Sequence, residues 1–284
     1  MRWPMKSKVK KFSFGMIFIY ILVMLAILVA VYPLIWTIIS SLKTDWDFMS
    51  NRMGLPAQIT FDNYIQAWKK GDFPLYFKNS VIVSSVSLVV MIGTASMAAF
   101  AFARYKFAIS KHLLNYFLIG QMLSAQLVLV AVYLVLVMCG LDNTKTGLSL
   151  VYAASGLPFT VFLLQGFFRS LPGELFESAE IDGCTEGGIF LKIALPLCKP
   201  GLSAALIVQF MYVWNEFSLS LVSIRTPTNI TLPVGLYKVI FDMYFSSRTL
   251  ACAGLIIAAL PVLIIYILFQ RQIMSGMTAG ALKG

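Results

Sequence analysis

Charged residues are scarce in this sequence. They make up 12% of its 284 residues, against roughly 25% in soluble domains, and the mean hydropathy is +0.84. This composition excludes an ordinary water-soluble globule. The net charge of +10 could indicate nucleic-acid binding, but the basic residues lie singly between apolar runs and form no basic face. We therefore expect no nucleic-acid partner.

Residues that carry catalysis or bind metals are also few. His112 is the only histidine, and the 4 cysteines have no metal-binding spacing. No glycine is followed directly by lysine, so a nucleotide-binding loop of the GxxxxGK[ST] type is absent. We therefore expect no catalytic residue, no metal site and no cofactor in this chain, and we do not expect it to be an enzyme.

Long uncharged runs are what the sequence has instead. Crossing the hydrocarbon core of a bilayer takes about 20 helical residues, and backbone groups in lipid must be hydrogen-bonded within the segment. The runs predict an all-α integral membrane protein with six transmembrane helices, near residues 14–42, 79–103, 113–139, 147–170, 200–224 and 249–270. The first run is too long for the apolar part of a cleaved signal peptide, so we expect it to remain as a span.

The placement of lysine and arginine predicts the orientation of the spans. The tail 1–12 and the turn 104–112 contain basic residues and no acid, whereas the loop 43–78 mixes both signs. Short basic segments face the cytoplasm, so both termini and the loop 172–199 are expected there. The chain should then lie in the membrane as a multi-pass protein, with lipid around it.

One predicted span contains an ionisable residue, Glu216 in the stretch "YVWNEF". A carboxylate within a span is by default a candidate functional group, so Trp214, Asn215 and Glu216 are candidates for a substrate pathway. The alternative is a structural role, in which Glu216 pairs with a polar group of a neighbouring helix. A single carboxylate without a relay gives little support for a carrier driven by protons or sodium ions.

Four of the 12 acidic residues, Glu177, Glu180, Asp182 and Glu186, fall within ten positions of the loop 172–199, here called the knuckle. Good helix-forming sequence follows Pro172 and should end at Gly183, because glycine tolerates a left-handed helix C-terminus. Thr185 can cap a second short helix, which Leu195-Pro196 should stop before the fifth span. Small side chains on the first helix would let a partner's backbone approach closely. The predicted product is a helix–turn–helix surface for a cytoplasmic partner.

The knuckle resembles the EAA loop of ABC-importer permeases, in which E-A-A, three residues, G, nine residues and I-x-L-P follow one another. The matching residues here are Glu177-Ser178-Ala179, Gly183 and Ile193-Ala194-Leu195-Pro196. The stretches "FDNYIQAW", "YFKNS", "YVWNEF" and "QRQIMSGMTAGALKG" are also similar to carbohydrate-uptake permeases related to the maltose system, specifically to the shorter permease subunit. The resemblance covers residues 13–284, as one transmembrane domain. The third span lacks a proline that the family leads us to expect.

The resemblance implies a bacterial or archaeal cytoplasmic membrane and a division of labour among several proteins. A second, homologous permease would complete the pathway, a dimer of ATPase subunits would bind ATP and Mg, and an extracytoplasmic binding protein would deliver a sugar or oligosaccharide. Residues 177–183 would form the coupling helix that docks on the ATPase, and the tail 275–284 would reach the same interface. The loop 225–248 would face the binding protein. The implied coupling residues are Glu177, Ser178, Ala179, Asp182, Gly183, Ile193, Leu195 and Pro196.

Two other functions remain open from the sequence alone. The chain could be a self-contained secondary carrier that uses Glu216, or a membrane anchor that only recruits a cytoplasmic partner. Neither the transported sugar nor the permease subunit that contacts it most can be read from the sequence.

Overall fold

A computed structural model describes residues 14–70, 72–105, 107–122, 124–244 and 247–281, so the predicted basic tail 1–12 lies outside the described residues. Every regular element within these ranges is helical, as the sequence predicts. The elements are α1 (Phe14–Ser41), α2 (Asp45–Ser50), α3 (Asp62–Lys70), α4 (Phe73–Arg104), α5 (Ser110–Met122), α6 (Ala125–Met138), α7 (Lys145–Arg169), α8 (Gly173–Ile181), α9 (Glu186–Ile189), η1 (Phe190–Ala194), α10 (Leu195–Leu197), α11 (Lys199–Asn215), α12 (Ser218–Ser223), η2 (Pro227–Asn229), α13 (Leu232–Tyr244) and α14 (Arg248–Ala281).

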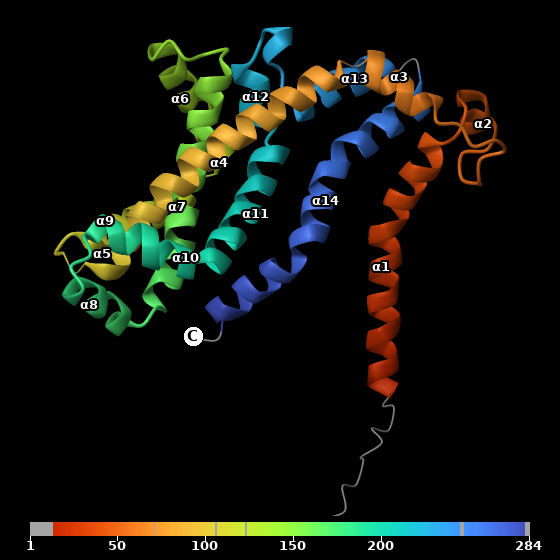
Figure 1. The fold of residues 1–284 in the computed structure, drawn as a ribbon. Coiled ribbons are helices and arrows are strands. Elements are labelled where there is room, and N and C mark those ends of the chain that lie inside the picture. Colours follow the sequence, from red (N-terminus) through yellow and green to blue (C-terminus); the bar gives the residue numbers. More distant parts are fainter. Residues whose placement is uncertain (1–13, 71, 106, 123, 245–246, 282–284) are drawn as a thin grey trace, which may run out of the picture.

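The centre of the molecule is the pair α4 and α7, which pack along each other more extensively than any other two helices. Helix α11 contacts both of them, and α14 packs against α11 and α13. Short helices gather at the two ends of α4 (Figure 1): α13 and α3 near its start, and α5, α8 and α9 near its end. The knuckle therefore sits at one end of the helix bundle.

Four described helices are long and apolar enough to cross a membrane: Phe18–Ser41 within α1, α4, α7 and Arg248–Leu268 within α14. A fifth crossing results if the segment Glu186–Leu197 and α11, which meet at an angle of 75°, are taken as one broken span. The chain is thus a multi-pass helical protein.

The predicted third and fifth spans are each interrupted. Between α5 and α6, Ser124 has extended backbone with φ −64° and ψ 131°, so a new helix begins at Ala125 although no proline lies there. The fifth predicted span ends at Asn215, because Glu216 adopts extended backbone and α12 begins at Ser218. The first break lies in an apolar stretch whose hydropathy gives no sign of it, whereas the second coincides with the polar residues Asn215 and Glu216.

The buried side chains form two separate hydrophobic cores. The first, here called the far core, contains residues from Ala67 in α3 to Ala253 in α14. The second, here called the knuckle core, has all of its buried members between Ala95 in α4 and Ala205 in α11. It contains the aromatic ring of Phe100, whose centroid lies within 5.3 to 6.1 Å of three other phenylalanine rings. The knuckle thus packs on its own core at the end of the bundle.

Helix α1 stands apart from the bundle along most of its length (Figure 1). None of the side chains in its most apolar window is buried within the chain. Bulky residues on all of its sides are exposed, for example Met24, Leu28 and Val29. Such a surface is suited to lipid or to the helices of another membrane subunit.

Candidate coupling surface and transmembrane cavities

The first helix of the knuckle, α8, ends as the sequence predicts. Gly183 has a left-handed φ of +77°. The Gly183 N–H donates to the Glu180 carbonyl (3.0 Å), and the Cys184 N–H donates to the Ala179 carbonyl (2.9 Å). This pair of bonds satisfies carbonyls that the end of the helix would otherwise leave free. It also fixes the angle at which the chain leaves α8.

The second half of the knuckle begins as predicted but ends differently. Thr185 caps α9, and its hydroxyl accepts a hydrogen bond from the Gly188 N–H (3.2 Å). The prediction that Leu195-Pro196 stops this helix was wrong, since helical structure continues to Leu197. A π-helical turn, Phe190–Ala194, precedes Pro196. A π-helical turn is wider than an α-helical turn, so the helix can include Pro196 although its nitrogen has no hydrogen to donate. The chain therefore turns only at Cys198.

The two sides of α8 differ in burial. Phe176 and Ala179 are buried in the knuckle core, so the close approach permitted by Ala179 is to its own chain. Glu177, Ser178 and Asp182 are exposed. Ile181 is 88% exposed, which is unusual for a large apolar residue on a rigid helix. The open face of α8 therefore combines acidic, small and apolar side chains.

The remaining residues of the predicted coupling motif lie along the underside of the knuckle. Ile193 and Leu195 are partly buried against the knuckle core, whereas Pro196 is exposed. Leu191 and Leu197, which the sequence did not single out, are exposed large apolar residues of the same segment. They extend the apolar surface of the knuckle beyond α8.

Arg104, at the end of α4, holds the two halves of the knuckle together. Its Nη2 forms an ion pair with Oε1 of Glu180, and its Nε forms a second with Oε2 of Glu186 (3.3 Å). The guanidinium carbon also lies 5.1 Å from the centroid of the Phe176 ring, a cation–π distance. One basic side chain thus connects α4 to both α8 and α9.

The second of these carboxylates is held in its charged form. A hydrogen bond from the Tyr105 hydroxyl and the ion pair with Arg104 lower the pKa of Glu186 from its ordinary value, against a smaller opposing effect of burial. Since an ordinary glutamate already titrates near 4.3, the carboxylate is ionised at neutral pH. The Arg104 connection is therefore intact at neutral pH.

Glu216 caps a helix at the break that follows α11. Its Oε1 accepts a hydrogen bond from the Leu219 N–H (2.9 Å) and its Oε2 accepts one from the Ser220 N–H (3.3 Å). The Tyr152 hydroxyl of α7 also donates to Oε2. These bonds satisfy N–H groups in the first turn of α12, which have no partner within that helix. The carboxylate thus has a structural explanation.

The other two candidate pathway residues lie in different surroundings. Trp214 is buried in the far core, where its ring stacks on Phe210 with centroids 5.3 Å apart and meets Phe77 edge-on at 5.6 Å. Asn215 is exposed, and its Nδ2 donates to the Met211 carbonyl one turn earlier (2.8 Å). Of the three candidate pathway residues, Glu216 lines a cavity.

We expect Glu216→Gln to lower stability modestly and to leave transport in place. Glutamine keeps one oxygen for the Leu219 N–H but places an NH₂ group near Tyr152. The loss should be about 1 kcal/mol, the usual net contribution of one hydrogen bond. The measurement is thermal unfolding of the purified protein, followed by uptake in the reconstituted complex.

Glu216→Leu is the matched comparison, because it removes every acceptor and leaves N–H groups of α12 unsatisfied. It should cost more than the glutamine variant, about 1–3 kcal/mol. Loss of transport in Glu216→Gln with normal assembly and stability would show that the charge itself serves transport, as in an ion-driven carrier.

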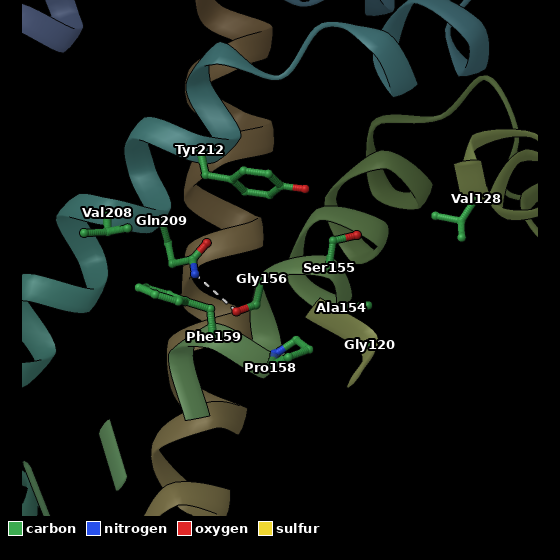
Figure 2. A pocket seen from close by; sticks show the side chains of 10 residues that line it. All are labelled: Gly120, Val128, Ala154, Ser155, Gly156, Pro158, Phe159, Val208, Gln209 and Tyr212. Carbon is green, nitrogen blue, oxygen red and sulfur yellow. Dashed lines mark hydrogen bonds between the residues drawn. The ribbon is translucent and has the colours of Figure 1, made fainter. Parts of the chain in front are cut away.

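A cavity of about 510 Å³ lies in the middle of the bundle. Figure 2 shows that α7 and α11 form facing walls, with Ser155, Pro158 and Phe159 on one and Gln209 and Tyr212 on the other. Its remaining described lining residues are Gly120, Val128, Ala154, Gly156 and Val208. Gln209 is 3% exposed, and its Nε2 donates to the Gly156 carbonyl (3.2 Å).

A second, smaller cavity of about 60 Å³ adjoins the first. The two share Val128, Ser155 and Tyr212 as lining residues, and Tyr152 and Glu216 line the smaller one. The polar groups of α7 and α11 thus form one continuous region near the break that follows α11.

Sequence reasoning did not find Arg104, Tyr152 or the cavity residues. The signals were weak: a basic residue at a turn, a polar Gln209 inside an apolar run, and a Gly-x-Pro sequence in α7. None of these indicates its partner, because the contacts join residues far apart in the chain.

Comparison with known proteins gives a consistent result. The model of the family described as "Binding-protein-dependent transport system inner membrane component" matches residues 91–278. A probable ABC transporter permease of Bacillus subtilis, YurM, is 33% identical over 97% of this chain and 91% of its own length. The diacetylchitobiose uptake permease NgcG of Streptomyces coelicolor is 32% identical over 90% of this chain and 85% of its own.

A solved structure shares the fold. A chain from a bacterial ABC transporter involved in import of the acidic polysaccharide alginate superimposes with a TM-score of 0.81 at 22% identity, over 91% of this chain and 95% of that one. The family match and the relatives confirm the resemblance to carbohydrate ABC-importer permeases, and the solved structure agrees with them in fold. The chain belongs to the family of binding-protein-dependent transport system inner membrane components, the permeases of ABC transporters.

Proposed function

We propose that this chain is one of two permease subunits of an ATP-driven sugar importer. In this complex a second, homologous permease completes the pathway, two ATPase subunits bind ATP and Mg, and an extracytoplasmic binding protein delivers the sugar. The knuckle faces the cytoplasm and receives the ATPase. The chain crosses the membrane six times, with α5–α6 and α11–α12 as interrupted spans and with both termini in the cytoplasm.

The observation that carries the proposal is the open face of α8. Glu177, Asp182 and the 88%-exposed Ile181 project from a helix whose other side is fixed by Phe176 and Ala179. Leu191 and Leu197 of the knuckle are also exposed, and exposed apolar surface rimmed by polar residues marks interaction sites.

The connection through Arg104 supports a coupling role for this surface. A force applied to α8 reaches α4 through the ion pairs to Glu180 and Glu186. Helix α4 contacts α7 and α11, which line the cavity. ATP binding in a docked subunit can shift the pathway between states only through such differential contacts.

The proposed cargo follows from the relatives. Their names assign diacetylchitobiose to the Streptomyces coelicolor permease and trehalose to SugB of Mycobacterium tuberculosis, which is 31% identical over 90% of this chain and 93% of its own length. The structural neighbour has also been solved with an alginate pentasaccharide-bound periplasmic protein, at a TM-score of 0.64 and 18% identity over 90% of this chain and 93% of that one. These names support sugar as cargo and a binding protein as partner.

We expect the purified chain alone to show neither ATP hydrolysis nor sugar uptake into liposomes under a proton or sodium gradient. Uptake should appear only when the second permease, the ATPase subunits and the binding protein are present together, because the energy comes from ATP bound elsewhere. The measurement is uptake of radiolabelled saccharides into proteoliposomes, with each component omitted in turn. Gradient-driven uptake by the lone chain would contradict the proposal and support a secondary carrier.

A further inference from the structure

We propose that the cavity between α7 and α11 is a binding subsite for an uncharged saccharide. The inference rests on the proposed function and names the part of the pathway that contacts the cargo and the class of cargo that fits it. The site belongs to this subunit, so the shorter permease takes part in recognition. Its evidence is the chemistry of the cavity wall.

Hydrogen-bonding groups meet on both walls of the cavity. Ser155 comes from α7, and Gln209 and Tyr212 come from α11. In Figure 2 the hydroxyl end of Tyr212 extends across the cavity toward Ser155. Hydroxyls and amides both donate and accept, which suits the many hydroxyl groups of a saccharide.

The backbone of α7 adds an acceptor to this wall. Pro158 lies inside the helix and has no N–H, so the Ala154 carbonyl lacks its ordinary helical partner. Ala154 and Pro158 both line the cavity. Gly156 lets the helices approach here, because a Cβ at its position would meet the side-chain oxygen of Gln209 at 2.6 Å.

The cavity also has suitable size and aromatic surface. Its volume of about 510 Å³ lies within the range of small-molecule sites, about 300–1,000 Å³. The rings of Phe159 and Tyr212 present apolar faces beside the polar groups. A saccharide has the same combination, since C–H groups alternate with hydroxyls around the ring.

The charge of the wall selects between classes of saccharide. No described residue that lines the cavity is charged, and the charged group nearest along the adjoining smaller cavity is the carboxylate of Glu216. The carboxylate of a uronate would lose its hydration water in the cavity without gaining a cationic partner. It would also approach the like charge of Glu216. A neutral saccharide meets neither cost.

The test uses the complete transporter in nanodiscs and in proteoliposomes, with cellobiose, maltotriose and trehalose as neutral probes and trigalacturonate as the acidic probe. Tyr212→Phe removes one hydroxyl and keeps the ring, and Ser155→Leu fills the cavity. Leu206→Ala is the matched control, because Leu206 lies on α11 but is 44% exposed and does not line the cavity.

We expect the wild-type complex to bind and take up at least one neutral probe and not to bind trigalacturonate. Tyr212→Phe should weaken equilibrium binding of that probe by about five- to tenfold, the effect of one lost hydrogen bond. Ser155→Leu should abolish binding. Thermal unfolding of Tyr212→Phe and uptake by Leu206→Ala should match the wild type.

The possible failures are distinguishable. Absence of saccharide uptake in the wild-type complex would overturn the proposed function. Normal uptake with unchanged binding in both cavity variants would leave that function standing and overturn the subsite. Trigalacturonate binding as tight as that of the neutral probe would overturn the assignment to uncharged saccharides.

Discussion

Arg104→Glu is expected to reduce ATP-driven sugar uptake by the assembled transporter to background. The change replaces the guanidinium that joins α4 to Glu180 and Glu186 with a third carboxylate. Attraction becomes repulsion, and the contact with the Phe176 ring is lost. Helices α8 and α9 should then lose their charged connection to the end of α4, so ATPase movements no longer reach the pathway. The measurement is uptake together with sugar-stimulated ATPase activity in proteoliposomes.

The stability cost of this change should be smaller than its effect on uptake. The side chains of Glu180 and Glu186 are 48% and 52% exposed, so water screens both pairs. Each exposed pair contributes only about 0–1 kcal/mol, far below the 3–5 kcal/mol expected for breaking a buried pair. The protein should therefore insert, assemble and unfold at nearly its normal temperature while its coupling is lost.

A charge exchange and a matched control make the result specific. Adding Glu180→Arg to Arg104→Glu restores one opposite-charge pair and should recover part of the uptake. Arg169→Glu makes the same charge change at an exposed arginine near the end of α7 and should retain most activity. Full uptake in Arg104→Glu would show that the knuckle moves α4 without this connection.

Glu177→Lys should also abolish coupled uptake, for a different reason. Glu177 is exposed on the open face of α8, and its carboxylate forms no hydrogen bond or ion pair with the residues that the structure describes. Its charge is therefore available to a docked partner. Reversing a charge at an interface typically costs about 2 kcal/mol or more when its partner is desolvated, which weakens docking more than tenfold. Co-purification of the ATPase with the tagged permease measures the loss directly.

Two controls apply to Glu177→Lys: its own thermal stability, and the same charge change at a distant carboxylate. Because no described residue forms a hydrogen bond or ion pair with the Glu177 carboxylate, thermal unfolding of the isolated permease should be unchanged. Asp62→Lys makes the same charge change at the exposed start of α3, at the other end of the bundle, and should leave ATPase binding intact. Normal sugar-stimulated ATPase activity in assembled Glu177→Lys would remove this residue from the docking surface.

Features governed by neighbours in the chain could be predicted from the sequence. The end of α8 at Gly183 and the cap of α9 at Thr185 depend on a few adjacent residues, and both predictions are confirmed. Helices α1 and α7 follow their apolar runs closely for the same reason. Local rules failed at Pro196, where a π-helical turn accommodates a residue that usually ends a helix.

Features that depend on tertiary contacts could not be predicted. Arg104 and Glu180 are 76 positions apart in the chain, and Tyr152 and Glu216 are 64 apart. Hydropathy identifies Glu216 as unusual within an apolar run, but only the fold shows that its oxygens cap α12. The cavity is even harder to predict from the sequence. Its polar residues lie on separate helices, and none of these helices has an unusual sequence by itself.

The separation of the two hydrophobic cores has a consequence for biosynthesis. Every buried member of the knuckle core lies between residues 95 and 205, whereas the far core requires residues as late as Ala253. Chains are made from the N-terminus, and parts whose contacts are complete can fold first. The contacts beneath the knuckle are therefore all available while α13 and α14 are still being synthesised. The proposed docking surface is therefore complete in sequence before the rest of the subunit has been made.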